Sequence, residues 1–153
     1  EYAPDTMKLA REEGLKNVWV TNGYMSRETL DMVIPFLDAT NVDYKGPNDG
    51  VYEKYCGGTA EPIMDNLKYL YEAGVHLEIT TLIVPGINDK PGQLEKIARF
   101  IARDLSKDVP WHISRFFPAW KMMDTPITSL EILEIAQAIG KNEGLKHIHV
   151  GNV

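Results

Sequence analysis

The segment 76–89, HLEITTLIVPGIND, decides the fold of this chain. Residues 77–84 form a run of β-branched and apolar side chains that ends at Pro85 and Gly86, which is typical of a buried strand entering a turn. A helix is predicted directly afterwards, because Pro91 suits a helix start and apolar residues then recur at helical spacing: Leu94, Ile97, Ala98, Ile101, Ala102 and Leu105. Together they indicate a parallel α/β unit, whose sheet we expect to be buried on both faces.

The same alternation of strand and helix recurs along the whole chain. Further strands are predicted at residues 17–22, 40–46, 111–117 and 147–152. Helices are predicted at residues 4–13, 26–37, 60–73, 91–105 and 128–143. Thr128 and Glu131 form a predicted capping box for the last helix, with an inward face of Ile132, Ile135, Ala136 and Ile139. Residues 46–58 are predicted to be a loop long enough to carry a function or local structure.

This pattern places the chain in the α/β class. A closed barrel of eight such units takes about 250 residues, whereas this chain has 153 residues. We therefore expect a partial (βα) barrel of about five parallel strands, a single domain over residues 1–153 that is cut at both ends. Segments 13–22 and 143–152 also align without gaps, which supports a repeated helix, glycine and strand unit.

Composition excludes several classes of partner. A net charge of −6 argues against nucleic acid, and no block of like charge suggests a membrane surface. No apolar run approaches the roughly 18 residues of a spanning helix. The single cysteine, Cys56, excludes an internal disulfide and fits a cytoplasmic location. An open sheet has exposed edges, so copies of the chain are expected to associate as a homo-oligomer.

Polar residues gather at the predicted carboxyl ends of the strands. If the strands are parallel, these ends share one rim, which would hold Thr21, Asn22, Asp43, Lys45, Thr80, Thr81, Arg115 and Asn152. An acid, a base and several hydroxyl or amide groups suit a polar ligand that carries both charges. Each also has a structural explanation: Asp43 and Lys45 as a solvated pair, Thr21 and Asn22 as turn residues, and the threonines as strand formers.

Other residues give weaker signals. His147 and His149 lack a visible third ligand, so no metal site is predicted. Cys56 has no evident catalytic histidine, so no catalytic residue is assigned. Trp120, together with Met122 and Met123, fits either a hydrophobic lid or a platform for a ligand.

Several motifs resemble those of radical S-adenosylmethionine (SAM) enzymes. They are VTNGYMS at 20–26, NVDYKG at 41–46, YCGG at 55–58, TLIVPGIND at 81–89, WHISRFFPAWKMMDTP at 111–126 and HVGNV at 149–153. Within that superfamily the chain is most similar to the activase-like members of the AmmeMemoRadiSam system, relatives of pyruvate formate-lyase activating enzyme. The resemblance covers essentially the whole chain and implies an enzyme with a partial or full (βα) barrel.

The resemblance also implies two cofactors. In this family a CxxxCxxC motif holds a 4Fe-4S cluster, and reductive cleavage of S-adenosylmethionine yields a deoxyadenosyl radical. The chain has no such motif, so we expect a C-terminal fragment that is inactive alone. Transferred by motif, the implied cofactor-binding residues are Thr21, Asn22, Asp43, Lys45, Thr80, Leu82 and Trp120.

In the family, the residue that matches Lys45 assists the carboxylate or ribose region of S-adenosylmethionine. The residues that match Thr80 and Leu82 contact ribose and adenine, and the residue that matches Trp120 lies against adenine. The substrate, which could be a protein, is not implied. Two alternatives stay open. One is an aldolase-like barrel with Lys45 as a Schiff-base or general-base residue. The other is a non-catalytic α/β binding module.

Overall fold

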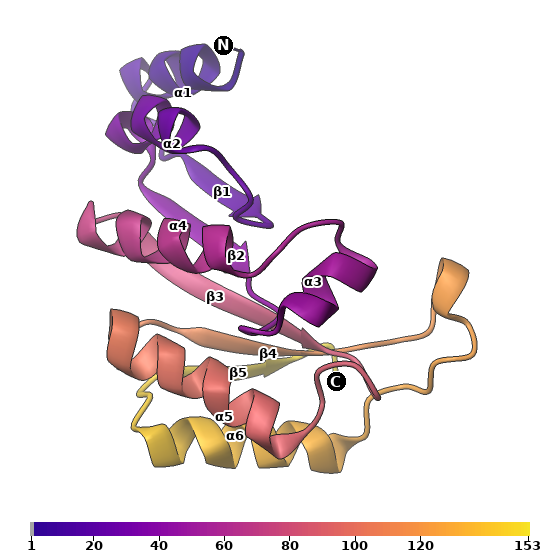
Figure 1. Ribbon diagram of the computed structural model, residues 1–153. Coiled ribbons are helices and arrows are strands. Elements are labelled where there is room, and N and C mark those ends of the chain that lie inside the picture. The colour runs from indigo at the N-terminus through magenta and orange to yellow at the C-terminus, as the bar shows by residue number, and fades with distance from the viewer. Residues whose placement is uncertain (1) are drawn as a thin grey trace.

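The computed structural model describes residues 2–153 and consists of one five-stranded parallel sheet with helices between the strands (Figure 1). The strands lie in chain order: β1 (Val18–Thr21), β2 (Ala39–Asp43), β3 (His76–Ile83), β4 (Trp111–Arg115) and β5 (Ile148–Gly151). The helices are α1 (Tyr2–Glu12), α2 (Arg27–Val33), α3 (Asp49–Tyr55), α4 (Glu61–Glu72), α5 (Pro91–Phe100) and α6 (Leu130–Glu143). The predicted α/β class and partial barrel are confirmed.

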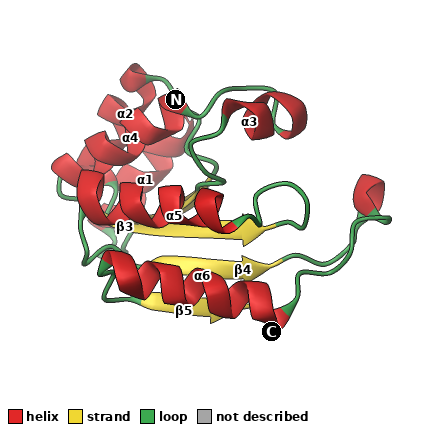
Figure 2. Ribbon diagram, turned by 60° about the horizontal axis from the view of Figure 1, so that its bottom comes forward, coloured by secondary structure: helices red, strands yellow, loops and turns green. Residues whose placement is uncertain are grey.

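Helices cover one face of the sheet, and the other face is open. Strands in chain order that are joined by right-handed crossovers place the crossover helices on the same side, and Figure 2 shows α5 and α6 running alongside β3, β4 and β5. Burial in β3 alternates accordingly: Ile79 and Thr81 are fully buried, whereas Glu78 and Thr80 are half-buried. The expectation of a sheet buried on both faces is therefore wrong for this chain.

The hydrophobic core lies between the helices and the covered face. Trp111 and Ile113 of β4 are fully buried there. Helix α5 and the turn that continues it contribute the predicted stripe, of which Leu94, Ile97, Ala98, Ile101 and Ala102 are buried. The helix then widens into a π-turn, Ile101–Leu105, and its neighbour Phe100 packs against Tyr44 at a ring-centroid distance of 5.1 Å.

The predicted start of α6 is wrong by one residue. Ser129 is the N-cap, and its hydroxyl accepts a hydrogen bond from the Ile132 amide at 3.3 Å. Thr128 is fully buried instead, where its hydroxyl donates to the Ile83 carbonyl at 2.6 Å and accepts from the Phe116 amide at 3.1 Å. A buried hydroxyl needs hydrogen-bond partners. Because Ile83 and Phe116 already bond the Thr128 hydroxyl, this hydroxyl does not cap the helix.

The inward face of α6 matches the prediction in part. Ala136 is buried, and Ile132 and Ile139 are half-buried and pack against the core. Ile135 is exposed instead, and Leu133 and Gly140 are buried. Gly140 faces the sheet, and a Cβ added at this position would lie 2.8 Å from Ile148 and 3.0 Å from Trp111. The absence of a side chain at Gly140 therefore lets the helix lie close to the sheet here.

The repeated segments share one helix-ending geometry. Gly14 and Gly144 both have left-handed backbone, with φ of 77° and 91°. In each case the next residue returns a hydrogen bond to the helix, from Leu15 to the Ala10 carbonyl at 2.9 Å and from Leu145 to the Gly140 carbonyl at 3.0 Å. Glycine adopts this conformation without steric cost, which explains why the two segments look alike in sequence.

The predicted loop 46–58 does carry local structure, the helix α3, whose N-cap Asn48 accepts from the Gly50 amide at 3.0 Å. In the predicted strand 111–117 the alternation ends at Arg115, because Phe116 is buried and Phe117 is exposed. No helix within residues 2–153 is both long enough and apolar enough to cross a membrane.

The close approach at Gly140 gives a test of the core. Gly140→Ala should lower the free energy of unfolding by about 1–2 kcal/mol, because overpacking against buried Trp111 outweighs the helix propensity that alanine adds. The matched control is Gly92→Ala in α5, where an added Cβ meets nothing within 4 Å; it should be neutral or stabilising by up to about 1 kcal/mol. Urea denaturation of both variants measures the difference, and equal effects would contradict this packing.

Candidate functional site

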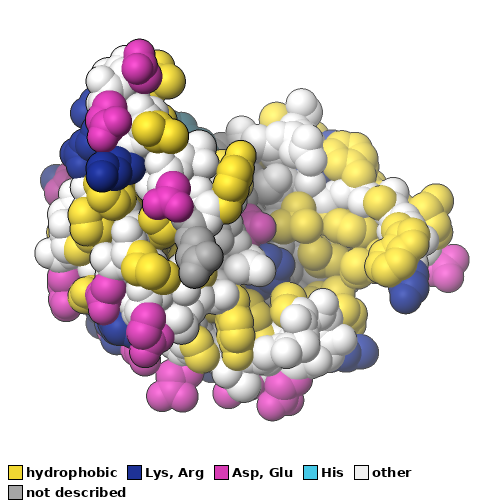
Figure 3. Space-filling view, turned by 90° about the horizontal axis from the view of Figure 1, so that it is seen from above, with side chains coloured by type: hydrophobic (Ala, Val, Ile, Leu, Met, Phe, Trp, Pro, Cys, Tyr) yellow, Lys and Arg dark blue, Asp and Glu magenta, His cyan; other side chains and the backbone are white. Residues whose placement is uncertain are grey.

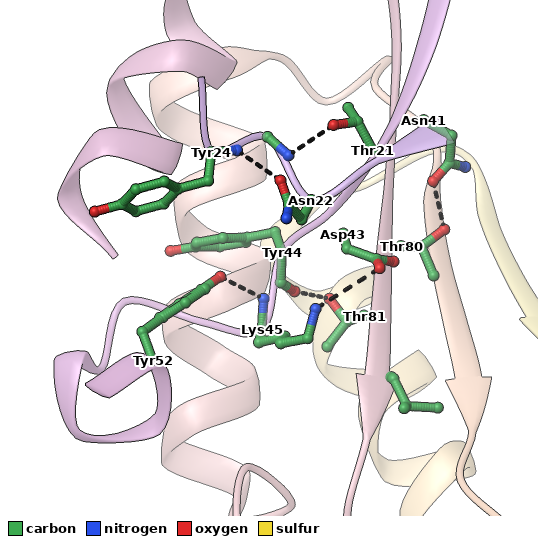
Figure 4. A network of polar contacts seen from close by, with 12 residues as sticks. Thr21, Asn22, Tyr24, Asn41, Asp43, Tyr44, Lys45, Tyr52, Thr80 and Thr81 are labelled. Carbon is green, nitrogen blue, oxygen red and sulfur yellow. Dashed lines mark hydrogen bonds and ion pairs between the residues drawn. The ribbon is translucent and has the colours of Figure 1, made fainter. Parts of the chain in front are cut away.

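The predicted rim forms at the carboxyl ends of β1, β2 and β3. Parallel pairing places Thr21 beside Val42 and Asp43 beside Thr80. Figure 4 shows Thr21, Asn22, Asp43, Lys45 and Thr80 in one neighbourhood, contributed by three successive strands. We refer to this group, with Leu82, as the rim site.

Asp43 and Lys45 form the charged part of the rim site. The Lys45 Nζ lies 3.7 Å from an Asp43 carboxylate oxygen, and the two side chains are 29% and 47% exposed. A partly solvated ion pair at this distance contributes little stability. Both charged groups can therefore turn toward a ligand at small cost.

The hydroxyl and amide groups of the rim are partly engaged within the protein. The Thr80 hydroxyl donates to the Asn41 side-chain oxygen at 2.7 Å. The Thr21 hydroxyl accepts from the Gly23 amide at 3.2 Å, and the Asn22 side-chain oxygen accepts from the Tyr24 amide at 3.0 Å. Thr21 and Asn22 thus do shape the turn after β1, as the structural explanation predicted.

Three residues predicted at the rim have structural contacts instead. Thr81 is fully buried on the helix-covered face, where its hydroxyl donates to the Tyr44 carbonyl at 2.8 Å. Arg115 donates to the Thr128 carbonyl at 2.7 Å, and Asn152 donates to the Arg115 carbonyl at 3.1 Å. Thr81 faces away from its neighbour Thr80 because successive residues of a strand point to opposite faces.

Lys45 lines three pockets, and two of these also include another residue of the rim site, Asn22 or Leu82. One, of about 350 Å³, is lined by Asn22, Tyr24, Lys45, Tyr52, Cys56, Gly57, Gly58 and Ile63. The other, of about 200 Å³, has mainly apolar walls and is lined by Lys45, Val51, Tyr55, Cys56, Leu82, Val84, Ile87, Asn88, Phe116 and Met122. An apolar pocket with a few polar groups at its edge is the usual form of a small-molecule site, so the second pocket suits a flat aromatic base.

Trp120 lies apart from the rim site. It is 81% exposed, has a left-handed backbone with φ of 48°, and begins a short 3₁₀ turn (Trp120–Met122) on a projecting loop. Figure 3 shows a hollow with apolar walls between the body of the molecule and a projecting segment. Of Trp120, Met122 and Met123, it is Met122 that shares the pocket with Leu82.

A second polar cluster, which sequence reasoning missed, lies on the open face of the sheet. Glu78 pairs with His112 at 2.7 Å and with His76 at 3.2 Å, and His112 stacks on His149 with ring centroids 4.9 Å apart. The available signal was the alternation of β3, which puts Glu78 on the same face as Thr80. The predicted partner of His149 was His147, which lies before β5.

The Glu78 carboxyl has a shifted pKa. Burial by itself raises its pKa, but hydrogen bonds from His76 and His112, and the charge of these imidazoles, outweigh burial and hold the pKa below its ordinary value of 4.5. Ionised Glu78 therefore contributes to the stability of this face of the sheet.

The residues present fit one of the two implied cofactors. Lys45, Asp43 and the apolar pocket match the carboxylate, amine and adenine of S-adenosylmethionine in chemistry. Within residues 2–153, no group of three histidine, cysteine, aspartate or glutamate side chains is placed to hold a metal ion. A 4Fe-4S cluster, which needs several thiolates, does not fit the described residues, whose one cysteine is Cys56.

Comparison with known proteins identifies the family. The family model of the Radical SAM superfamily matches residues 1–101. The chain therefore belongs to the radical SAM superfamily, a family of enzymes.

Its relatives include activating enzymes. An uncharacterized protein of Methanocaldococcus jannaschii is 42% identical over 153 residues, which is 100% of this chain and 45% of that protein. A putative glycyl-radical enzyme activating enzyme of the same organism is 30% identical, covering 71% of this chain and 42% of that protein. Pyruvate formate-lyase 1-activating enzyme of Escherichia coli is 25% identical, covering 69% of this chain and 43% of that enzyme. The chain thus spans less than half the length of these relatives.

Solved structures share the fold. A domain of pyruvate-formate lyase-activating enzyme from Bacteroides vulgatus superposes with a TM-score of 0.83 at 21% identity, covering 99% of this chain and 90% of that chain. Streptococcus suis SuiB bound to S-adenosylmethionine superposes with a TM-score of 0.73 at 10% identity, covering 97% of this chain and 35% of that chain. At these identities the likeness shows the fold alone.

The Glu78 cluster gives a test by pH. Because the pKa of Glu78 is lower in the folded than in the unfolded state, its stabilising effect is complete above the unfolded value and is lost as the pH falls through the folded value. The wild type should therefore exceed Glu78→Gln in free energy of unfolding at pH 7, by an amount that shrinks below about pH 4.5. Urea denaturation across pH measures it, with the exposed Glu134→Gln in α6 as control; a difference independent of pH would contradict the assignment.

Proposed function

We propose that this chain is the part of a radical SAM, activase-like enzyme that binds S-adenosylmethionine at the rim site. The observation that carries the proposal is the meeting of Lys45 and Asp43 from the end of β2 with Thr80 and Leu82 of β3, beside an apolar pocket. The superfamily match supports it. The same match leaves the aldolase-like and binding-module alternatives without support.

Each rim residue has a proposed role in binding. The Lys45 ammonium attracts the methionyl carboxylate or a ribose hydroxyl, and Asp43 accepts hydrogen bonds from the same polar end. The Thr80 oxygen, whose proton is given to Asn41, accepts from ribose. Leu82 packs against adenine within the apolar pocket.

Thr21, Asn22 and Trp120 complete the proposed set. Thr21 and Asn22 form the wall after β1, toward the polar end of the cofactor. Trp120 is proposed to lie against adenine. Because Trp120 is 81% exposed, this role requires the projecting loop to close over the pocket.

The chemistry of the reaction needs groups that these residues do not hold. When both cofactors are bound, radical SAM enzymes obtain a deoxyadenosyl radical by reductive cleavage of S-adenosylmethionine. We propose that the cluster ligands belong to a part of the enzyme outside residues 1–153, and that the fragment alone is inactive. The residues of this chain bind and orient the cofactor and exclude water from its adenine.

The partner is proposed by analogy with the relatives. Relatives are named for the activation of pyruvate formate-lyase and of isethionate sulfite-lyase, so we propose that the whole enzyme acts on a partner protein. Association of copies through the edge strands β1 and β5 stays a prediction. Val18 and Val20 of β1 are 61% and 82% exposed, which would favour such association.

Replacement of Lys45 tests the proposed site. In the full-length protein, Lys45→Ala should weaken S-adenosylmethionine binding about tenfold, equivalent to about 1.4 kcal/mol, because it removes a charge that faces the ligand. The absorbance of the 4Fe-4S cluster should not change, since lysine is not an iron ligand. Isothermal titration calorimetry measures the affinity.

The matched control is Lys146→Ala. Lys146 forms an ion pair of 2.7 Å with Asp108, and it lies before the amino end of β5, at the opposite end of the sheet from the rim. This variant should keep wild-type affinity. If Lys45→Ala also binds S-adenosylmethionine as the wild type does, Lys45 is not part of the site and the proposal fails.

A further inference from the structure

We infer that Asn88 is a positioning residue that holds Lys45 at the edge of the cofactor pocket, an inference that rests on the proposed function. Asn88 lies in the turn after β3, 43 residues beyond Lys45. By sequence alone it is an ordinary turn residue that follows Pro85 and Gly86. Its side chain, however, is directed into the protein and is only 2% exposed.

The Asn88 carboxamide joins two strand ends. Its oxygen accepts from the Val84 amide at 2.7 Å, and its nitrogen donates to the carbonyls of Leu82 at 3.0 Å and Lys45 at 3.3 Å. The first two bonds are local and shape the turn. The third is the link between the end of β3 and the segment that follows β2.

Lys45 needs this link because it lies beyond the sheet. The last backbone hydrogen bond of the β2 side runs from the Tyr44 amide to the Thr80 carbonyl at 2.9 Å. After it, side chains hold both peptide groups of Lys45. Its amide donates to the Tyr52 hydroxyl at 2.9 Å, and its carbonyl accepts from Asn88.

Tyr52 is suited to be the second support. It is 2% exposed, and burial raises its pKa to about 12, although the hydrogen bond from Lys45 lowers it. The phenol therefore stays neutral at physiological pH, and its oxygen can accept the Lys45 amide. A charged phenolate in this position would change the field at the lysine.

The same asparagine fixes both walls of the pocket. Lys45, Leu82, Val84 and Asn88 itself all line the apolar pocket. Asn88 binds the backbone of the first three residues, so it sets the position of the ammonium relative to the apolar wall. Displacements of about 1 Å at a functional site can cost up to about a hundredfold in function. Loss of the hydrogen bond from Asn88 to Lys45 is therefore expected to have a measurable effect on binding.

The amide nitrogen is the group that a substitution can remove selectively. Asn88→Asp keeps an oxygen acceptor for the Val84 amide, and hence the local turn. It replaces the donor with a carboxylate oxygen that faces the two carbonyls of Leu82 and Lys45. A mere turn residue would tolerate aspartate, whereas a residue that positions Lys45 would not.

Asn17→Asp is a matched control at the other end of the sheet. The Asn17 side chain also donates to two carbonyls, those of Met7 at 2.9 Å and Phe36 at 3.1 Å. Asn17 immediately precedes β1, so it lies at the amino ends of the strands. The control loses the same kind of contact without touching the rim site.

The experiment measures two quantities in the full-length protein: S-adenosylmethionine affinity by calorimetry, and hydrogen exchange of residues 44–48 by mass spectrometry. We expect Asn88→Asp to weaken binding about tenfold in the wild-type background and less than about threefold in a Lys45→Ala background. Exchange of residues 44–48 should become at least about tenfold faster. Asn17→Asp should change affinity less than about twofold.

Opposite results overturn the inference. Unchanged exchange at residues 44–48, or equal losses of affinity in both backgrounds, would show that Asn88 does not act through Lys45. If Asn88→Asp does not fold, Tyr52→Phe removes the other support and should give the same pattern. Normal affinity in Lys45→Ala would defeat the proposed function itself, whereas a weakened Lys45→Ala with a silent Asn88→Asp would defeat this inference alone.

Discussion

The order of the strands is the constraint on which the rest of the structure depends. The five strands lie in chain order, and because crossovers between parallel strands are almost always right-handed, the crossover helices α2, α4, α5 and α6 pack on one face. The strands must then be apolar toward the helices and are free to be polar on the other side. Ile79 and Thr80 of β3 show the two sides of this rule. The same parallel order brings the carboxyl ends of all strands to one edge, where the rim site forms.

Buried hydrogen bonds connect the core to this edge. The Trp111 indole donates to the Thr81 hydroxyl at 3.0 Å, and that hydroxyl donates to the Tyr44 carbonyl at 2.8 Å. Each of these polar groups is therefore satisfied within the core, where an unpaired group would cost stability. The close approach of α6 at Gly140 packs the same tryptophan from the helix side. The position of Lys45, one residue beyond Tyr44, thus depends on contacts from β2, β3, β4 and α6.

The family assignment and the proposed site rest on different observations. The superfamily match shows which kind of enzyme the chain belongs to, and the similarity to SuiB concerns the fold alone. Neither names the substrate, because the function of such folds lies in their sites. The structure of this chain adds the arrangement around Lys45 and the cluster of Glu78, His112 and His149 on the open face.

The sequence by itself determined the α/β class, the number of strands, the stripe of α5 and the gathering of Thr21, Asn22, Asp43, Lys45 and Thr80 at one rim, because periodicity and turn residues act locally. It did not show which face of the sheet lies open, because residues 77–84 are mostly apolar or β-branched and only the alternation of Glu78 and Thr80 marks the polar side. Nor could it show that the Thr128 hydroxyl bonds Ile83 and Phe116 and does not cap the helix. It also did not show that Trp120 is exposed on the projecting loop while Met122 lines the pocket. Only tertiary structure decided these points, because each depends on hydrogen bonds or packing between residues that are distant in the chain.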